Sequence, residues 1–456
     1  MSKETALSKK TGFKEEIPPY TPQQATIEAS RCLLCYEPPC TESCPAGIDV
    51  GKFIRQIRFK NYIGAARTIR ADNPLGGICA RVCPTERLCM ENCYSAKLTM
   101  PIEIGRLQRF ATDPELRGEI EPIVLSQPRA PEKKKKVAVI GAGPAGLGCA
   151  LKAWQLGYDV TVFEAGKTPG GVLTWGIPKY RLPDRVSRSE ISYLKKLGIR
   201  FLTGKIIDAE FNLDHLRKKG FQAIFIGTGL SRAKTVGLPG EELKRVYTAD
   251  DFLFDAKSSG GNPKKMKMKP GKNVVVIGGG NVAMDAACTA KRLGAERVDL
   301  VCLESYDEMP AFRSDIEFAQ KSGIEFHTRS KPLRIAGDKK GKVKALKGIR
   351  MKWRKPGLLV PSNAVEIPGS EFTIPADTVI EAIGMGPHPA VREAFPGIKT
   401  IGPGLVVVNK KTGMTNIKGV FAGGDIMNGG DTVVQALAEG RLAADGIDRY
   451  LDKTGN

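Results

Sequence analysis

The sequence predicts an α/β fold in which two Rossmann-like dinucleotide-binding domains follow an α-helical domain, and three observations carry this prediction. An apolar strand, a glycine-rich turn, a helix and a second strand follow one another from Lys135 to Ala165. The same order recurs from Asn273 to Ser305. Eight of the eleven cysteines lie between Cys32 and Cys93, where apolar residues recur with helical spacing and no strand alternation is seen.

The composition is that of a multidomain chain without a membrane span. A length of 456 residues is enough for about three domains, and no run of eighteen apolar residues occurs. The first residues, MSKETALSKK, lack the apolar stretch of a signal peptide, which predicts a cytoplasmic location. The net charge of +21 comes largely from dispersed lysine runs, so we interpret it as a solvated surface and not as a nucleic-acid site.

Changes in periodicity and composition divide the chain into five segments. A helical domain is predicted over residues 1–125, and a linker rich in Pro and Lys over 126–136. The first dinucleotide domain is predicted over 137–247, the second over 248–382, and the return of the chain to the first domain over 383–456. Residues 258–272 are expected to form a flexible loop before the second glycine turn.

The first glycine-rich turn has the spacing of a dinucleotide site. Gly141 makes the tight turn, Gly143 lets the backbone approach a pyrophosphate, and Gly146 lets the helix pack on the strand. Glu164 ends the second strand, where a carboxylate accepts hydrogen bonds from a ribose diol. A purely structural turn is the alternative, but strand, turn, helix, strand and acid all occur in the expected order.

The second turn has Gly278 and Gly280 at the same spacing, with Ala283 in the third position. Its second strand is predicted to end at Glu304, and a carboxylate there favours the free 2′-hydroxyl of NAD over the 2′-phosphate of NADP. We therefore predict NADH as the nucleotide. The alternative is that Glu304 lies just past the strand and that Arg313 or another base reaches a phosphate.

The clustered cysteines have the spacing of iron-sulfur ligands. They form the patterns C-x2-C-x4-C-x3-C-P and C-x3-C-x5-C-x3-C, and runs of close thiolates ending in Cys-Pro are typical of iron-sulfur ligation. Zinc is the alternative, but it prefers paired Cys-x2-4-Cys motifs or histidine partners, and the three histidines lie far from this region. From spacing alone Cys79 would be the eighth ligand.

Two such turns together with the segment GVFAGGDI resemble the two-dinucleotide flavoprotein family. The resemblance implies that FAD binds at the first turn and a nicotinamide nucleotide at the second. It also implies that Asp425 holds the ribityl chain, that the helix starting near Thr432 faces the flavin, and that FIGTGL and EAIGMG mark the crossings between domains. No redox cysteine pair lies beside the flavin segment, and Cys149, Cys288 and Cys302 are expected to be buried packing residues.

By this resemblance the contacts with the two nucleotides are assigned to named residues. The residues implied for FAD are Gly141, Gly143, Pro144, Ala145, Gly146, Glu164, Gly171, Val172, Arg181, Gly229, Gly424, Asp425, Thr432 and Val433, with Gly384 at the second crossing. Those for NAD(H) are Gly278, Gly280, Asn281, Val282, Ala283 and Glu304.

The segments RCLLC, CARVCPTERLC, DNPLG and PIEIGRLQRFATD resemble dihydropyrimidine dehydrogenase, most closely the electron-input subunit of the bacterial two-subunit enzyme. The resemblance extends over nearly the whole chain and implies two 4Fe-4S clusters. The ligands it implies are Cys32, Cys35, Cys40 and Cys93 for one cluster, and Cys44, Cys83, Cys89 and Gln108 for the other. Cys79 would then be a spare packing thiol.

The resemblance implies an oxidoreductase that takes electrons from NADH and passes them through FAD and the clusters to a partner. The expected partner is an FMN and iron-sulfur subunit that reduces uracil and thymine to 5,6-dihydropyrimidines, because this chain lacks the eight strand-helix repeats of an FMN-binding barrel. A glutamate synthase large subunit or a ferredoxin is the alternative partner. A non-catalytic or zinc-binding scaffold is the alternative of another class.

Overall fold

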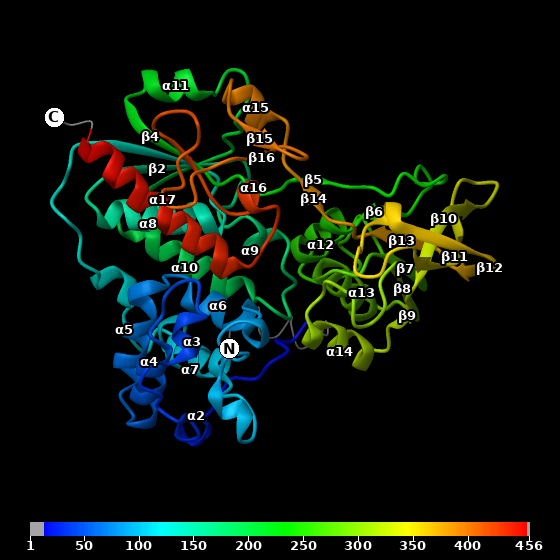
Figure 1. Ribbon diagram of the computed structural model, residues 1–456, viewed down its shortest axis with the longest axis horizontal. Helices are drawn as coiled ribbons and strands as arrows, with labels where there is room; N and C mark the ends of the chain where they lie inside the picture. The colour runs from blue at the N-terminus through cyan, green and yellow to red at the C-terminus, as the bar shows by residue number, and fades with distance from the viewer. Residues whose placement is uncertain (1–12, 454–456) are drawn as a thin grey trace. The chain divides into compact units, whose positions relative to one another are not determined.

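The computed structural model describes residues 13–453, which fall into two compact units (Figure 1). One unit comprises residues 15–174, 181–231 and 386–453, and we call it the outer unit. The other comprises residues 13–14, 175–180 and 232–385, and we call it the inserted unit because its main segment interrupts the outer unit. Short strands β5 (Arg232–Ala233) and β14 (Met385–Gly386) pair with each other where the chain crosses between the units.

The outer unit begins with the predicted helical region. Its helices are α2 (Pro22–Ser30), α3 (Pro39–Glu42), α4 (Val50–Arg58), α5 (Tyr62–Asp72), α6 (Gly76–Val82) and α7 (Ile104–Leu116), with 3-10 turns η1 (Thr85–Arg87), η2 (Tyr94–Lys97) and η3 (Ile123–Ser126). Side-chain caps set the starts of α4 and α5, because Asp49 accepts from the Lys52 N–H and Asn61 from the Gly64 N–H, each at 2.9 Å. Phe53, Ile57 and Leu107 are fully buried between α4, α5 and α7.

A five-stranded parallel sheet follows, in the order β17-β4-β1-β2-β3. Its strands are β1 (Lys136–Ile140), β2 (Asp159–Glu164), β3 (Arg200–Thr203), β4 (Phe221–Ile226) and β17 (Val420–Ala422), and β15 (Thr400–Ile401) pairs separately with β16 (Leu405–Val406). The helices are α8 (Pro144–Gln155), α9 (Val172–Trp175), α10 (Asp184–Lys196), α11 (Leu213–Lys218), α15 (Ala390–Ala394), α16 (Asp425–Asn428) and α17 (Val433–Lys453). The backbones of α8 and α17 pack closely, since a Cβ on Gly440 would lie 2.0 Å from the Ala145 carbonyl oxygen.

The inserted unit has its own parallel sheet, in the order β6-β13-β7-β8-β9. Its strands are β6 (Val246–Thr248), β7 (Asn273–Ile277), β8 (Arg297–Val301), β9 (Glu325–His327) and β13 (Thr378–Glu381). Its helices are α12 (Ala249–Ser258), α13 (Asn281–Arg292) and α14 (Arg313–Lys321), with the turn η4 (Pro361–Asn363). An antiparallel sheet of β10 (Ser330–Gly337), β11 (Val343–Trp353) and β12 (Ala364–Pro375) completes the unit.

Two details of the predicted organisation differ in the structure. The main segment of the inserted unit begins at Arg232 and not at residue 248, because Val236, Leu238 and Leu243 already pack against the core of that unit. The loop at 258–272, predicted to be flexible, carries Met266 into the hydrophobic core at 3% exposure. The backbone N–H groups of Lys267 and Met268 both donate to one Asp255 carboxylate oxygen at 2.7 Å, which fixes this loop.

The predicted linker at 126–136 is held against the outer unit along its length. The Ala130 N–H donates to the Gln155 carbonyl at 2.7 Å, and Lys133 forms an ion pair with Asp448 at 2.6 Å. Within residues 13–453, no helix has both the length and the apolar character needed to cross a membrane.

Candidate dinucleotide and cysteine sites

The first glycine turn lies between β1 and α8 and leaves no room for side chains at two positions. A Cβ on Gly141 would lie 2.4 Å from the Gly227 carbonyl oxygen, and one on Gly146 would lie 1.9 Å from the Gly141 carbonyl oxygen. At Gly143 the opposite holds, because no atom lies within 4 Å of an added Cβ. The backbone is therefore bare and open on one side at Gly143, as the approach of a pyrophosphate requires.

The carboxylate of Glu164 and the first turn of α8 lie beside this glycine turn. Glu164, the last residue of β2, accepts from the Ala142 N–H at 2.8 Å through Oε2 and from the Gly166 N–H at 2.7 Å through Oε1. The carboxylate therefore lies beside the turn, where its remaining lone pairs can accept from a ribose diol. α8 starts at Pro144, so the unpaired N–H groups of its first turn lie next to the open backbone of Gly143.

The C-terminal segment reaches the same turn. Gly424 has a φ of +75°, and a Cβ there would lie 2.8 Å from the Ala145 Cβ, so the GGD turn packs against the start of α8. Asp425 follows directly, and burial raises the pKa of its carboxyl. Gly171 also reaches the turn, because its Cβ position lies 3.0 Å from the Gly143 Cα.

Other predicted flavin residues are placed as follows. α17 starts at Val433, with the Thr432 hydroxyl accepting from the Gln435 N–H at 3.2 Å, so the predicted helix start is confirmed. Val172 is partly exposed beside Gly171, and Arg181 is half-buried before α10. Gly229 and Gly384 have φ of +63° and +94° and lie just before the two crossings.

The sequence prediction missed Glu439, although its carboxylate organises the C-terminal turn. Glu439 Oε2 accepts from the Gly424 N–H at 2.7 Å and from the Asn428 side-chain amide at 3.1 Å. Its only signal in the sequence is its position on the predicted closing helix. A carboxylate on a helix face is usually solvent-exposed, so periodicity alone gives no reason to select it.

The second glycine turn lies between β7 and α13 and repeats the geometry of the first. Gly278 has a φ of +137°, and a Cβ there would lie 2.3 Å from the Ala382 carbonyl oxygen, whereas Gly280 again faces open space. Ala283 is fully buried in the helix, which explains why a small residue serves in the third position. Asn281 accepts from the Phe312 N–H at 2.7 Å and so fixes the loop opposite the turn, while Val282 is 41% exposed.

Glu304 does not end the strand as predicted, because β8 ends at Val301. The carboxylate nevertheless returns to the glycine turn, since Glu304 Oε2 lies 3.0 Å from the Cβ position of Gly279. The neighbouring arginines are held by acids: Arg313 lies 3.7 Å from Asp307, and Arg329 lies 2.8 Å from Glu308. Glu304 therefore places a carboxylate beside the turn, where it could accept a hydrogen bond from a ribose diol.

The N-terminal cysteines form two neighbouring groups. The first group lines a single cavity with Leu33, Tyr94 and Ile102 and consists of Cys32, Cys35, Cys40 and Cys93. Burial, together with the nearby Cys32 and Cys93, raises the pKa of Cys40 to about 12. Buried thiols of this kind become good ligands only when a metal supplies the positive charge that stabilises the thiolates.

The second group consists of Cys44, Cys79, Cys83 and Cys89. A hydrogen bond with the Cys79 thiol, burial, and the nearby Cys89 and Cys44 all raise the pKa of Cys83. The pKa of Cys89 is raised to about 12 by burial, with Cys44 and Cys40 as its nearest charged neighbours, so the two groups adjoin. Cys79 therefore lies beside the three cysteines that the resemblance implies as ligands of the second cluster, although the resemblance gives Cys79 itself no ligand role.

Gln108 lies on α7, is 8% exposed, and donates from Nε2 to the Gly76 carbonyl oxygen at 2.7 Å. Gly76 is the first residue of α6, the helix that carries Cys79 and ends one residue before Cys83. Both candidates for the last ligand of the second group, Gln108 and Cys79, are therefore attached to the same helix.

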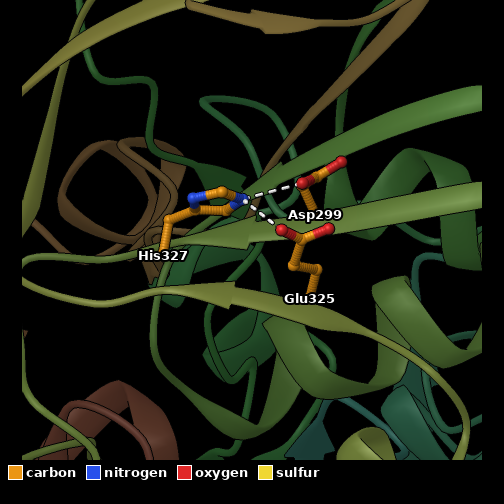
Figure 2. A group of neighbouring side chains, drawn as sticks. All are labelled: Asp299, Glu325 and His327. Atoms are coloured by element: carbon orange, nitrogen blue, oxygen red, sulfur yellow. Dashed lines mark hydrogen bonds and ion pairs between the residues drawn. The ribbon is translucent and has the colours of Figure 1, made fainter. Parts of the chain in front are cut away.

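A different trio of potential ligands lies at the β8–β9 edge of the inserted unit (Figure 2). His327 Nε2 lies 2.7 Å from Asp299 Oδ1 and 4.0 Å from Glu325 Oε1. Arg297 already binds both carboxylates, at 2.8 Å from Asp299 and 3.0 Å from Glu325. Arg297 and His327 lower the pKa of Asp299 despite its burial, so we interpret this group as an ion-pair network that ties two strands together.

The three isolated cysteines are buried, as predicted. Cys149 and Cys288 have no exposed surface and Cys302 is 3% exposed. Burial, with Glu304 nearby, raises the pKa of Cys302 to about 12. None of the three therefore has the character of a reactive thiol, which would require a lowered pKa and some exposure.

Two family models match the chain. Residues 135–440 match the pyridine nucleotide-disulphide oxidoreductase family, and residues 9–120 match the family described as dihydropyrimidine dehydrogenase domain II, 4Fe-4S cluster. The first match covers both glycine turns and the GGD turn. The second covers all eight clustered cysteines and Gln108.

Similar proteins extend over almost the whole chain. The NAD-dependent dihydropyrimidine dehydrogenase subunit PreT of Escherichia coli K12 is 39% identical over 438 residues, which are 96% of this chain and 97% of PreT. The glutamate synthase [NADPH] small chain of the same strain is 33% identical over 452 residues, 97% and 95% of the two chains. Among solved structures, FprA from Mycobacterium tuberculosis aligns with a TM-score of 0.58 at 16% identity, covering 71% of this chain and 86% of FprA.

The two nucleotide turns and the paired cysteine groups define an oxidoreductase that uses FAD, a nicotinamide nucleotide and 4Fe-4S iron-sulfur chemistry. The chain belongs to the pyridine nucleotide-disulphide oxidoreductase family, in the group that contains the dihydropyrimidine dehydrogenase subunit PreT and the glutamate synthase small chains. The predicted fold class and family are confirmed.

Proposed function

We propose that this chain is the electron-input subunit of an NAD-dependent dihydropyrimidine dehydrogenase. It oxidises NADH and passes the electrons through FAD and two 4Fe-4S clusters to a partner subunit that reduces uracil or thymine to the 5,6-dihydro compound. The observation that carries the proposal is the combination of two nucleotide turns and two cysteine groups on one chain, whose length matches that of a relative with this activity in its name. The cytoplasmic location remains a prediction.

When bound, FAD accepts a hydride equivalent from the nicotinamide, and 4Fe-4S clusters carry single electrons onward. The chain's own residues bind and orient these groups. The open backbone at Gly143 and the start of α8 support pyrophosphate binding, and Glu164 supports binding of the ribose diol. Asp425 and the start of α17 lie at the same end of the first sheet, where they can bind the ribityl chain and face the flavin ring.

For the clusters we propose the ligand sets that the family resemblance implies. Cys32, Cys35, Cys40 and Cys93 share one cavity, which supports their binding one cluster. Cys44, Cys83 and Cys89 are neighbours in the second group, and Gln108 would complete that set. Because Nε2 of Gln108 is engaged by the Gly76 carbonyl, its Oε1 is the atom left to bind iron.

We propose NADH as the electron donor. The support is the Glu304 carboxylate beside Gly279, which would repel a 2′-phosphate and accept from a 2′-hydroxyl. The guanidinium of Arg329 is already paired with Glu308 at 2.8 Å, whereas Arg313, 66% exposed and 3.7 Å from Asp307, is the neighbouring base that could still reach a phosphate.

The first cysteine group supports transfer to a protein partner because it lies under partly exposed apolar side chains. Leu33 is 47% exposed, Tyr94 is 46% exposed, and both line the cysteine cavity, while Tyr36 next to Cys35 is 96% exposed. The preferred partner is an FMN and iron-sulfur subunit of the dihydropyrimidine dehydrogenase type. A ferredoxin is an alternative acceptor.

A second candidate function is that of a glutamate synthase small subunit. The observation that favours it is the 33% identity with a glutamate synthase small chain over 97% of this chain. That relative is named for NADPH, so the position of Glu304 weighs against this candidate. The partner subunit, not the reaction at the nicotinamide, distinguishes the two functions.

The deciding experiment is co-purification of the tagged chain from its native host, with partners identified by mass. We expect an FMN-containing subunit, and we expect the complex to oxidise NADH when uracil is added. Recovery of a glutamate synthase large subunit, with NADH oxidation dependent on 2-oxoglutarate and glutamine, would establish the second candidate instead. Purified chain without flavin absorption or the broad absorption of iron-sulfur clusters would refute both.

A further inference from the structure

Three charged side chains are completely buried in the outer unit, and none of them belongs to the nucleotide turns or the cysteine groups. Arg70 of α5 lies 3.0 Å from Glu115 of α7 and 2.6 Å from Glu190 of α10, and all three side chains have 0% exposure. The two carboxylates raise the pKa of Arg70 despite its burial. The group therefore consists of one cation and two anions without solvent, an arrangement that is costly unless other polar groups satisfy the carboxylates.

Those other groups are the first backbone amides of α6. Glu190 Oε1 accepts from the Gly77 N–H at 2.7 Å, and its Oε2 accepts from the Ile78 N–H at 3.1 Å. A Cβ on Gly77 would lie only 2.5 Å from Glu190 Oε1, so the carboxylate fits directly against the bare glycine. Arg70 adds a bond to the Pro74 carbonyl at 2.7 Å, which holds the turn before the helix.

The helix held in this way carries the second cysteine group. α6 contains Cys79 and ends immediately before Cys83, and its first residue, Gly76, accepts the bond from Gln108. Glu190 comes from α10, which follows the first dinucleotide unit in the chain, whereas α6 belongs to the N-terminal helical region. One carboxylate of the flavin-binding part therefore determines where the cysteine helix begins.

We propose that Glu190 is a positioning residue for the second iron-sulfur cluster, fixing the cysteine helix α6 against the flavin-binding part of the outer unit. The inference rests on the proposed function in that it requires a cluster at the second cysteine group. Glu190 touches neither the flavin turn nor a cysteine in the contacts described, so it acts through the two amides of α6. Glu115 binds Arg70 without contacting the α6 amides, so it provides a matched control within the same buried group.

The test compares Glu190→Gln with Glu115→Gln in the full-length chain. Each variant removes one negative charge from the group, but only Glu190→Gln replaces an acceptor of an α6 amide with an amide donor. The readouts are FAD content from absorption, iron and acid-labile sulfide per chain, and the EPR spectrum and midpoint potential of each cluster.

We expect Glu190→Gln to keep FAD and the first cluster while the second cluster changes its EPR g values or loses its iron, about half of the total. Glu115→Gln should keep both EPR signals, with at most a rise in potential from the lost charge. Equal EPR changes in both variants would show a general effect of charge or folding, and an unchanged spectrum in Glu190→Gln would overturn the proposal.

If Glu190→Gln fails to fold, Gly77→Ala provides the second test, because its Cβ would push the Glu190 carboxylate away from the α6 amides without removing any charge. It should change the EPR signal of the second cluster alone, and normal spectra in Gly77→Ala would contradict the proposal. Failure of the premise taken from the proposed function, a cluster at the second cysteine group, is distinguishable, because the unmodified chain would then lack the EPR signal of that cluster and the iron that belongs to it.

Discussion

The carboxylate of Glu304 lies against Gly279 in the second glycine turn, with Oε2 3.0 Å from the position of a Cβ on that glycine. This contact occurs although β8 ends three residues earlier, at Val301. The chain between them bends back, and the Glu304 carbonyl accepts from the Arg329 N–H at 3.1 Å, which fixes the bend. The proposed preference for NADH would therefore depend on a loop, which can change in sequence without disturbing the sheet.

The first prediction is that Glu304→Arg shifts the preference from NADH toward NADPH. Replacing the acid with a base removes the repulsion of a 2′-phosphate, so the ratio of kcat/KM for NADPH to that for NADH should rise by about tenfold or more, or about 1.4 kcal/mol. Steady-state dye reduction measures it. Arg313→Ala is the control and should leave the ratio unchanged; loss of NADPH use in Arg313→Ala would instead assign phosphate recognition to Arg313.

The second prediction concerns the two open glycines. Gly143→Val and Gly280→Val place side chains in free space, so the folded protein should tolerate them, but each side chain fills the approach to one pyrophosphate. Gly143→Val should weaken FAD binding by at least about tenfold, and Gly280→Val should weaken NADH binding by a similar factor while FAD stays bound. Flavin content and NADH titration test this, and each variant controls for the other. Loss of both nucleotides from either variant would contradict the assignment.

The third prediction separates Gln108 from Cys79 as the last ligand of the second cluster. Gln108→Ala should disturb one cluster, whereas Cys79→Ala should leave the iron content and both EPR signals intact. If Cys79 is only a packing residue, Cys79→Ala removes one thiol that is hydrogen-bonded with Cys83, and we expect this loss to have a modest structural effect. A loss of iron from this variant would therefore point to a ligand role for Cys79. If Cys79→Ala loses iron and Gln108→Ala does not, the second cluster has four cysteine ligands.

The fourth prediction is a dependence of stability on pH that arises from Glu381. This residue ends β13 at 3% exposure, and burial, with Glu241 nearby, raises its pKa from 4.5 to about 7. The folded carboxyl therefore holds its proton more tightly than the unfolded one. Its effect on stability is most favourable below pH 4.5 and is lost as pH rises through about 7.

Glu381→Gln removes this loss, because the amide stays neutral at every pH. The difference in free energy of unfolding between the variant and the unmodified chain should rise by on the order of 2–3 kcal/mol from pH 5 to pH 8, at about 1.4 kcal/mol per pKa unit. Thermal unfolding of the full-length chain at the two pH values measures the gain. Glu371→Gln, on exposed β12, is the control and should show no such difference; an equal effect of Glu381→Gln at both pH values would refute the prediction.

Much of the fold was predictable because, in the two nucleotide units, the glycine spacing in the sequence indicates the same strand, turn and helix that the structure contains. The spacing of Gly141, Gly143 and Gly146 specifies strand, turn and helix together, and each glycine occupies the position that the motif assigns to it. The boundary at Arg232 was not predictable in this way. It depends on Val236 and Leu238 packing against core residues such as Leu346, which lie about a hundred residues further along the chain.

The cysteine region shows a different limit. Spacing identified the ligand types, but sequence separation hides which thiols meet, and the structure brings Cys79 beside Cys83 and Cys44. Glu190 carries no local signal at all. Its neighbours in the sequence resemble any amphipathic helix, and its role becomes apparent only when α6 and α10 are packed together.

The interrupted construction of the outer unit has a consequence for biosynthesis. Its sheet is complete only when β17 pairs with β4, and Val420 leaves the ribosome long after Ile226. At about 5–20 residues per second, this delay is roughly 10–40 s, whereas the inserted unit is synthesised in full before β17 emerges. The Asp425 turn emerges later still, so loading of the flavin is expected to wait for this turn, and chains truncated before β17 should be made without the cofactor.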